Sequence, residues 1–140
     1  MCHSISLQKG LRVLVVDNDF DSCVLLMVLF AEYGVKTTTA ICATQALDII
    51  QQAPPDLLIS EIMLPDDDGY SFIRKVKAWE KTYGVEIPAI ALTVCVKESD
   101  RLHALAAGFC RYLVKPINVD ELIATIAHIT GQGMSAKACC

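Results

Sequence analysis

The sequence lacks an apolar stretch long enough to cross a bilayer. Its longest uninterrupted apolar run covers residues 23–31, whereas a membrane helix needs about 20 such residues. The first residues show no basic segment followed by an apolar one, so no signal peptide is predicted. Basic residues are also in the minority, 12 against 16 acidic ones, and an acidic domain does not attract a phosphate backbone. These shortages exclude a membrane span and argue against direct nucleic-acid binding.

The cysteines lack a recognisable pattern. Seven cysteines are spread over 140 residues, and no two have the Cys-x-x-Cys spacing of a zinc site or a redox pair. An odd number at scattered positions is typical of small buried side chains in a reducing compartment. We therefore expect a cytoplasmic protein.

Short β-branched segments alternate with longer segments of helical spacing. The predicted strands are 12–16, 35–39, 57–60, 89–93 and 112–114, and the predicted helices are 21–33, 43–52, 70–82, 98–107 and 119–129. Such alternation indicates a parallel sheet with helices on both faces. The length predicts a single domain over residues 1–140, with its core at about 11–130 and a flexible tail at 131–140.

The first predicted helix is apolar around most of its circumference, from Val24 to Ala31. Such a helix is either buried more deeply than usual or presents one face to a partner. Because one apolar stripe must meet the sheet in either case, we expect burial and ordinary packing.

Polar residues follow four of the five predicted strands. They are Asp17-Asn18-Asp19 after the first strand, Glu61 and the acidic turn 66–68 after the third, Thr93 after the fourth, and Lys115-Pro116 after the fifth. In an open parallel sheet, ligands bind beyond the carboxyl ends of the strands. We therefore expect carboxylates, a hydroxyl and an ammonium group to converge on one edge of the sheet.

This order of motifs resembles the receiver domain of bacterial two-component response regulators, over about residues 11–130. The segments that carry the resemblance are Val15-Val16-Asp17-Asn18, Glu61-Ile62-Met63-Leu64-Pro65 with Asp68-Gly69, Thr93, Tyr112 and Lys115-Pro116. The resemblance implies an α/β fold of the flavodoxin-like, doubly wound (βα)5 type with strand order 2-1-3-4-5. It also implies a histidine kinase, a phosphotransfer protein or a downstream regulator as partner.

The resemblance assigns a role to each of these positions. In the family, a carboxylate after the third strand takes a phosphoryl group from a phosphohistidine, and Mg²⁺ neutralises the phosphoryl oxygens. Thr93 matches the switch hydroxyl, Tyr112 the aromatic switch residue and Lys115 the lysine that holds the phosphoryl group. Pro116 matches a proline that often follows a cis peptide bond.

Glu61 stands where the family has the phosphorylated aspartate. The extra methylene moves the carboxylate outward by about 1.3 Å, and a misplacement near 1 Å can slow transfer about a hundredfold. A phosphoryl group carries roughly −1.5 to −2 charges, so a glutamate can mimic the phosphorylated state only in part. We therefore expect that Glu61 is not phosphorylated in the usual way.

The implied magnesium site would use Asp17, Asn18, Glu61 and Met63. Asn18 stands at the second acidic position of the family and adds no charge, so we expect weakened Mg²⁺ binding. Asp19 is adjacent and could compensate, but Asp is also a common N-cap, and we favour that role at the start of the first helix.

Together these features predict a receiver-like signalling module that is not an enzyme and acts through protein–protein interaction. A dimer is a further alternative, since the resemblance places a dimer or output face on the last two helices and the strand between them. Two other functions stay open. One is a working receiver that uses a neighbouring carboxylate. The other is a phosphohydrolase of the haloacid dehalogenase type, suggested by Asp17-x-Asp19 with Thr93 and Lys115.

Overall fold

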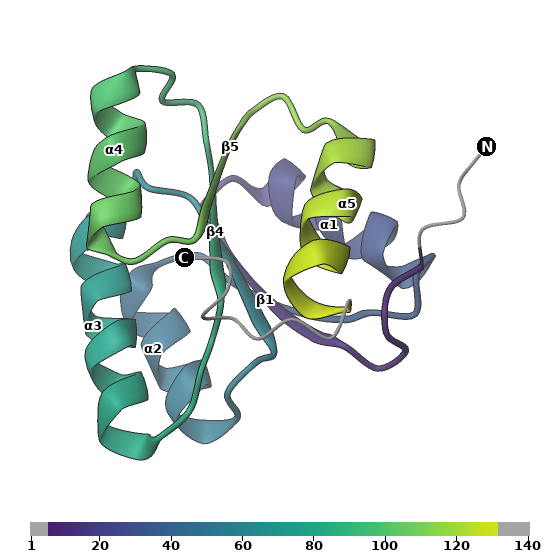
Figure 1. The fold of residues 1–140 in the computed structure, drawn as a ribbon, viewed down its shortest axis with the longest axis horizontal. Coiled ribbons are helices and arrows are strands. Elements are labelled where there is room, and N and C mark those ends of the chain that lie inside the picture. Colours follow the sequence, from purple (N-terminus) through teal and green to yellow (C-terminus); the bar gives the residue numbers. More distant parts are fainter. Residues whose placement is uncertain (1–5, 132–140) are drawn as a thin grey trace.

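The computed structural model describes residues 6–131, in which five parallel strands alternate with five helices (Figure 1). The strands are β1 (Arg12–Val16), β2 (Lys36–Ala40), β3 (Leu57–Ser60), β4 (Ala89–Thr93) and β5 (Arg111–Val114). The helices are α1 (Phe20–Ala31), α2 (Ala43–Gln52), α3 (Gly69–Tyr83), α4 (Glu98–Ala107) and α5 (Val119–Thr130). The strand order is β2-β1-β3-β4-β5, so the predicted fold is confirmed.

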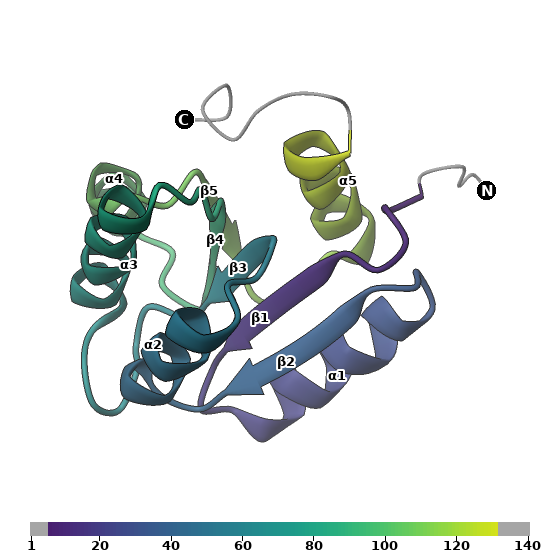
Figure 2. The same cartoon turned by 90° about the horizontal axis from the view of Figure 1, so that it is seen from below.

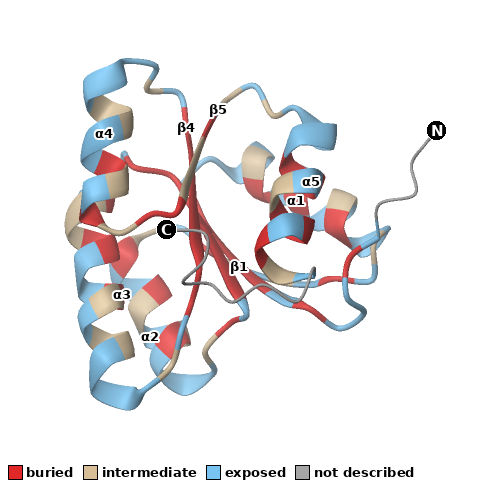
Figure 3. Ribbon diagram, in the orientation of Figure 1, coloured by how far each residue is buried: buried red, intermediate tan, exposed pale blue. Residues whose placement is uncertain are grey.

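The helices form two layers, one on each face of the sheet (Figures 1 and 2). α1 and α5 cover one face, and α2, α3 and α4 cover the other. Each layer encloses its own apolar cluster, one containing Phe30 and Ile126 and the other containing Phe72 and Ile50. Because both faces are covered, every residue of β3 and β4 is buried, and the buried colour runs along the centre of Figure 3.

Most predicted boundaries agree with the structure to within one residue. The largest difference is at the end of α1, which was predicted at residue 33 and lies at Ala31. The chain then turns through Gly34, whose φ of 74° suits glycine, before β2 begins one residue later than predicted. Most of the predicted tail at 131–140 lies outside the described residues.

The expectation that α1 would be buried is wrong for half of its surface. Cys23, Leu26 and Phe30 form a single buried stripe that meets the sheet. Leu29 is half-buried. Five large apolar side chains are exposed, and we call them the outer face of α1: Phe20 (76% exposed), Val24 (38%), Leu25 (52%), Met27 (43%) and Val28 (58%). One stripe is enough to pack on the sheet, and in the described structure no further layer covers the opposite side.

Side chains cap three of the helices at their amino ends. Asp19 accepts a hydrogen bond from the backbone N–H of Asp21 at the start of α1, which confirms its predicted capping role. Asn118 and Asp68 do the same for α5 and α3. None of the helices within residues 6–131 is long and apolar enough to span a membrane.

Helix α2 has no cap of its own, because the Cys42 side chain makes no capping hydrogen bond. Asp66, in the loop between β3 and α3, supplies the cap instead. Its carboxylate accepts from the backbone N–H groups of Ala43 (2.8 Å) and Thr44 (2.9 Å) and from the Thr44 hydroxyl (2.7 Å). These hydrogen bonds, led by that of the Thr44 hydroxyl, hold the pKa of Asp66 well below its usual range.

We expect Asp66→Ala to lower the thermal midpoint at neutral pH, because it leaves two backbone N–H groups of α2 without their partner. A folded pKa below the unfolded value gives stability that is present above the unfolded pKa and lost as the pH falls. The difference between wild type and variant should therefore be constant at neutral pH and shrink below the ordinary Asp pKa of 3.8. Thermal unfolding at several pH values measures this difference.

Asp67→Ala is the matched control, because the Asp67 carboxylate pairs with the exposed Lys75 at 2.8 Å. It should change the midpoint less than Asp66→Ala does. Equal effects of the two substitutions would contradict the capping role of Asp66.

Candidate functional site

Two carboxylates and one ammonium group meet beyond the carboxyl ends of β1, β3 and β5. Lys115 Nζ lies 2.7 Å from Asp17 Oδ2 and 3.2 Å from Glu61 Oε1. All three side chains are shielded from solvent, with 13% of Lys115 and 6% of each acid exposed. Burial opposes the charge of Lys115, but its hydrogen bond to Asp17 and the charges of Asp17 and Glu61 outweigh this and raise its pKa.

The carboxylate of Glu61 receives hydrogens from four donors. Oε2 accepts from the backbone N–H groups of Ile62 (2.7 Å) and Met63 (3.2 Å) and from the hydroxyl of Thr93, while Oε1 faces Lys115. The extra methylene of glutamate lets the side chain fold back over its own following peptide bonds. Glu61 therefore uses the hydroxyl and the ammonium that the resemblance assigns to a phosphoryl group.

A chain of hydrogen bonds leads from Glu61 to the surface beside α4. Thr93 is completely buried; its hydroxyl donates to Glu61 and accepts from the backbone N–H of Cys95 at 3.3 Å. The hydroxyl of Tyr112 donates to the backbone carbonyl of Cys95 at 2.6 Å. Burial raises the pKa of Tyr112 to about 12, with the neighbouring Cys95 and Asp100 adding to the shift. Both predicted switch residues thus contact the same residue of the β4–α4 loop.

The role of Cys95 was not predicted from the sequence. It acts through its backbone N–H and carbonyl groups, which every residue except proline possesses, so its side chain gives no signal. Only its position two residues after Thr93 could have suggested it.

The four predicted magnesium ligands differ in exposure. Asp17 and Glu61 are buried, whereas Asn18 and the Met63 side chain are exposed. Met63 instead contributes its backbone N–H to Glu61. Asp17 Oδ1 accepts from the backbone of Asp19 at 2.9 Å, and Lys115 stands between the two acids.

Within residues 6–131 no group of three or more His, Cys, Asp and Glu side chains is arranged to hold a metal ion. The ammonium group of Lys115 supplies positive charge between the two acids. Lys115 and Pro116 are joined by a cis peptide bond, as the resemblance implies.

Gly69 packs closely against the loop that carries Glu61. Its backbone N–H donates to the carbonyl of Ile62 at 2.6 Å, and a Cβ on Gly69 would lie 2.6 Å from Ile62 Cα. Only glycine fits this contact, which fixes the peptide that donates to Glu61.

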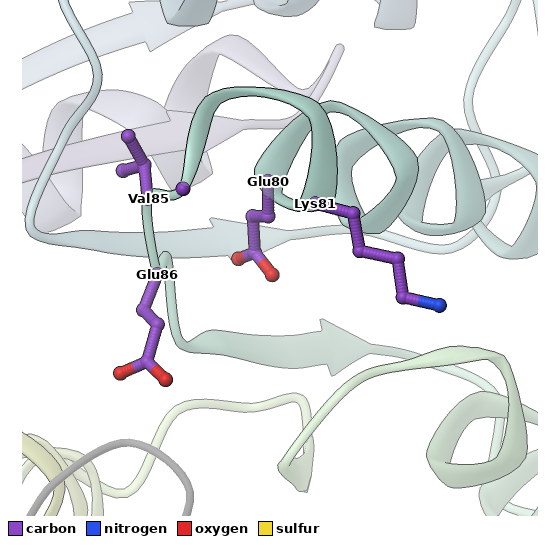
Figure 4. A pocket seen from close by; sticks show the side chains of 5 residues that line it. Glu80, Lys81, Val85 and Glu86 are labelled. Atoms are coloured by element: carbon purple, nitrogen blue, oxygen red, sulfur yellow. The ribbon is translucent and has the colours of Figure 1, made fainter.

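A separate pocket of about 330 Å³ lies at the amino end of β4, away from this site (Figure 4). It is lined by Glu80, Lys81, Gly84, Val85 and Glu86. Glu80 accepts from the backbone of Ile87 at 2.6 Å and from Lys77 at 3.1 Å, so its carboxylate ties α3 to the start of β4. We assign it a structural role.

Solved structures share this fold. A two-component response regulator from Clostridium difficile aligns with a TM-score of 0.82 at 28% identity, covering 91% of this chain and all of that one. The receiver domain of Ssk1 from Saccharomyces cerevisiae, solved with the histidine phosphotransfer protein Ypd1, aligns with a TM-score of 0.82. It is 21% identical over 89% of this chain and 92% of that one, which shows the fold alone.

Curated proteins are similar in sequence. An uncharacterized 14.6 kDa protein from Leptolyngbya boryana is 40% identical over 79% of this chain and 83% of its own length. Several other relatives are longer. The chain spans 47% of the response regulator SaeR from Staphylococcus epidermidis and 25% of the transcriptional regulatory protein ZraR from Klebsiella oxytoca. The family model described as the response regulator receiver domain matches residues 13–127, most of the chain. The chain therefore belongs to the response regulator receiver domain family.

Proposed function

We propose that this receiver domain is a signalling module whose site is permanently occupied by its own Glu61. The observation that carries the proposal is the pair of contacts from Glu61 to Thr93 and Lys115. The resemblance gives the same two residues to the phosphoryl group of a phosphorylated receiver. Glu61 therefore holds Thr93, and through Cys95 the β4–α4 loop, in one arrangement without phosphorylation.

Several features of Glu61 disfavour phosphoryl transfer to it. An attacking oxygen needs a free lone pair in line with the phosphorus atom. Oε2 already accepts three hydrogen bonds, and Oε1 faces Lys115. The side chain is also only 6% exposed, so the carboxylate would have to leave its four donors before it could attack.

None of the neighbouring carboxylates is well suited to accept a phosphoryl group in place of Glu61. Asp19 caps α1, Asp66 caps α2 and Asp68 caps α3. Asp17 is bound to Lys115 and to the backbone of Asp19. Each would lose a hydrogen-bonding role by turning toward a phosphodonor, so we do not favour a receiver that uses one of them.

The phosphohydrolase alternative also loses support. That chemistry needs Asp19 to face the substrate as a second carboxylate, but both of its oxygens face α1. Oδ1 accepts from the backbone of Asp21 at 3.2 Å and Oδ2 from the Ser22 hydroxyl at 2.9 Å. We therefore propose a signalling module rather than an enzyme.

We further propose that Mg²⁺ binding is weakened in this chain, although receiver domains typically bind Mg²⁺. Lys115 already balances charge between Asp17 and Glu61, and Asn18 replaces an acid with a neutral amide. A divalent cation would have to displace the Lys115 ammonium from the two carboxylates. This would leave a shielded positive charge without its partners, which is unfavourable.

The outer face of α1 supports a role in protein–protein contact. It presents large apolar side chains on the helix that follows Asp17, and this helix carries no lysine or arginine. Receiver domains interact with histidine kinases and phosphotransfer proteins, as in the Ypd1–Ssk1 complex. We propose such a protein or a downstream regulator as the partner, within the cytoplasm.

Wild-type protein incubated with acetyl phosphate and Mg²⁺ should give no phosphoryl adduct in its intact mass. Glu61→Asp should restore acceptance, at a rate about a hundredfold or more above wild type, because the shorter arm frees the position for the phosphoryl group. If only the double variant Glu61→Asp/Asn18→Asp accepts, the metal site is limiting as well. A wild-type adduct that Glu61→Gln abolishes would contradict the proposal.

Millimolar MgCl₂ should leave the thermal midpoint of the wild type unchanged, because a ligand has little effect on the midpoint when its concentration is far below Kd. The double variant Glu61→Asp/Asn18→Asp should show a saturable rise. KCl at matched ionic strength serves as the control. A saturable rise in the wild type that Asp17→Asn removes would show that the native site binds the ion.

Lys115→Met should lower the free energy of unfolding by about 3–5 kcal/mol, since it leaves two buried carboxylates without a counter-charge. Adding Glu61→Gln to this variant should recover part of the loss. Urea unfolding of the single and double variants measures the coupling, with Lys75→Met as a surface control. Purely additive effects would contradict a shared charge cluster.

A further inference from the structure

Two aromatic rings stack between α3 and α4, outside the site already described. The rings of Tyr70 and His103 have centroids 3.7 Å apart and planes inclined by 11°. Tyr70 lies in the first turn of α3, and His103 lies in the middle of α4. α4 therefore rests on α3 partly through a stacked pair that contains a titratable ring.

Arg74, one turn after Tyr70, contacts the edge of the His103 ring. Its Nη2 lies 3.2 Å from His103 Nε2. A guanidinium group has only donors, so Nε2 must be the acceptor. An imidazole can accept at Nε2 only when it is neutral and carries its proton on Nδ1. The observed contact therefore belongs to the uncharged form of His103.

Protonation of His103 would remove this acceptor and place two cations next to each other. Tyr70 and Arg74 from α3 contact the ring, and Asp100 lies one turn earlier on the same helix as His103. Asp100 also hydrogen-bonds to Tyr70, and burial together with this neighbour raises the pKa of the Tyr70 hydroxyl. Charging His103 would thus set the Arg74 guanidinium against the imidazolium.

The stack lies beside the chain of contacts that begins at Glu61. Tyr112 is influenced electrostatically by Tyr70, Asp100 and Cys95, so these groups share one neighbourhood. Cys95 lies in the loop that leads into α4, and its backbone carbonyl accepts a hydrogen bond from the Tyr112 hydroxyl. A change in how α4 sits on α3 would therefore reach the loop that Glu61 and Thr93 hold.

We propose that Tyr70, His103 and Arg74 form a pH-sensitive clamp that holds α4 on α3 while His103 is neutral and loosens when it is protonated. Histidine is the side chain whose charge ordinarily changes between pH 5 and 8. The inference goes beyond the proposed function and does not depend on whether Glu61 accepts a phosphoryl group.

Amide hydrogen exchange measured by NMR at about pH 7.5 and about pH 5.5 tests the clamp, with rates corrected for intrinsic pH dependence. In the wild type we expect protection of the α4 amides to fall at least about threefold at the lower pH, while that of α2 stays constant. His103→Gln and Arg74→Gln should each abolish this pH dependence, the first by removing the proton site and the second by removing the repulsion.

His128→Gln is the matched control. His128 is exposed in the last turn of α5, where a positive charge favours the helix, so this variant should keep the response of α4. The clamp would be overturned by an α4 protection that does not change with pH, by a response that survives His103→Gln, or by an equal loss of protection in α2. The α2 amides also report whether each variant is folded.

Discussion

The organisation of the site depends on one buried carboxylate whose hydrogen-bond partners all come from the protein itself. Glu61 receives hydrogens from two backbone groups, a hydroxyl and an ammonium. A buried charge is tolerated only when it is paired and hydrogen-bonded. The positions of Thr93, Lys115 and the loop after β3 can be understood as the set of partners that this requirement selects. In a receiver with an aspartate, a shorter carboxylate would leave room among the same donors.

The contacts of Glu61 continue outward through main-chain groups. Thr93 and Tyr112 both hydrogen-bond to the backbone of Cys95. The positions of these two side chains are therefore coupled to the conformation of the loop before α4. Helix α4 also contacts α3 through the Tyr70–His103 stack. This helix therefore lies between two polar connections, one fixed by Glu61 and one dependent on a titratable ring.

The sequence predicted the fold and the central residues of the site because both follow from short-range patterns. Buried runs and their spacing identify strands and helices, and the carboxyl ends of parallel strands bring Asp17, Glu61, Thr93 and Lys115 together. The outer face of α1 was assigned wrongly, because a run apolar at every position has no periodicity that separates two sides. The Asp66 cap joins distant segments, and the role of Cys95 is carried by its backbone. Neither leaves a local signal.

The cap that Asp66 places on α2 has a consequence for access to the site. Asp66 belongs to the same loop whose first peptide groups hold Glu61, and it is bound to the first turn of α2. The loop cannot swing away from Glu61 without giving up that cap. Opening of the loop to admit solvent to the carboxylate would therefore be coupled to fraying at the start of α2, a helix that contributes no side chain to the site.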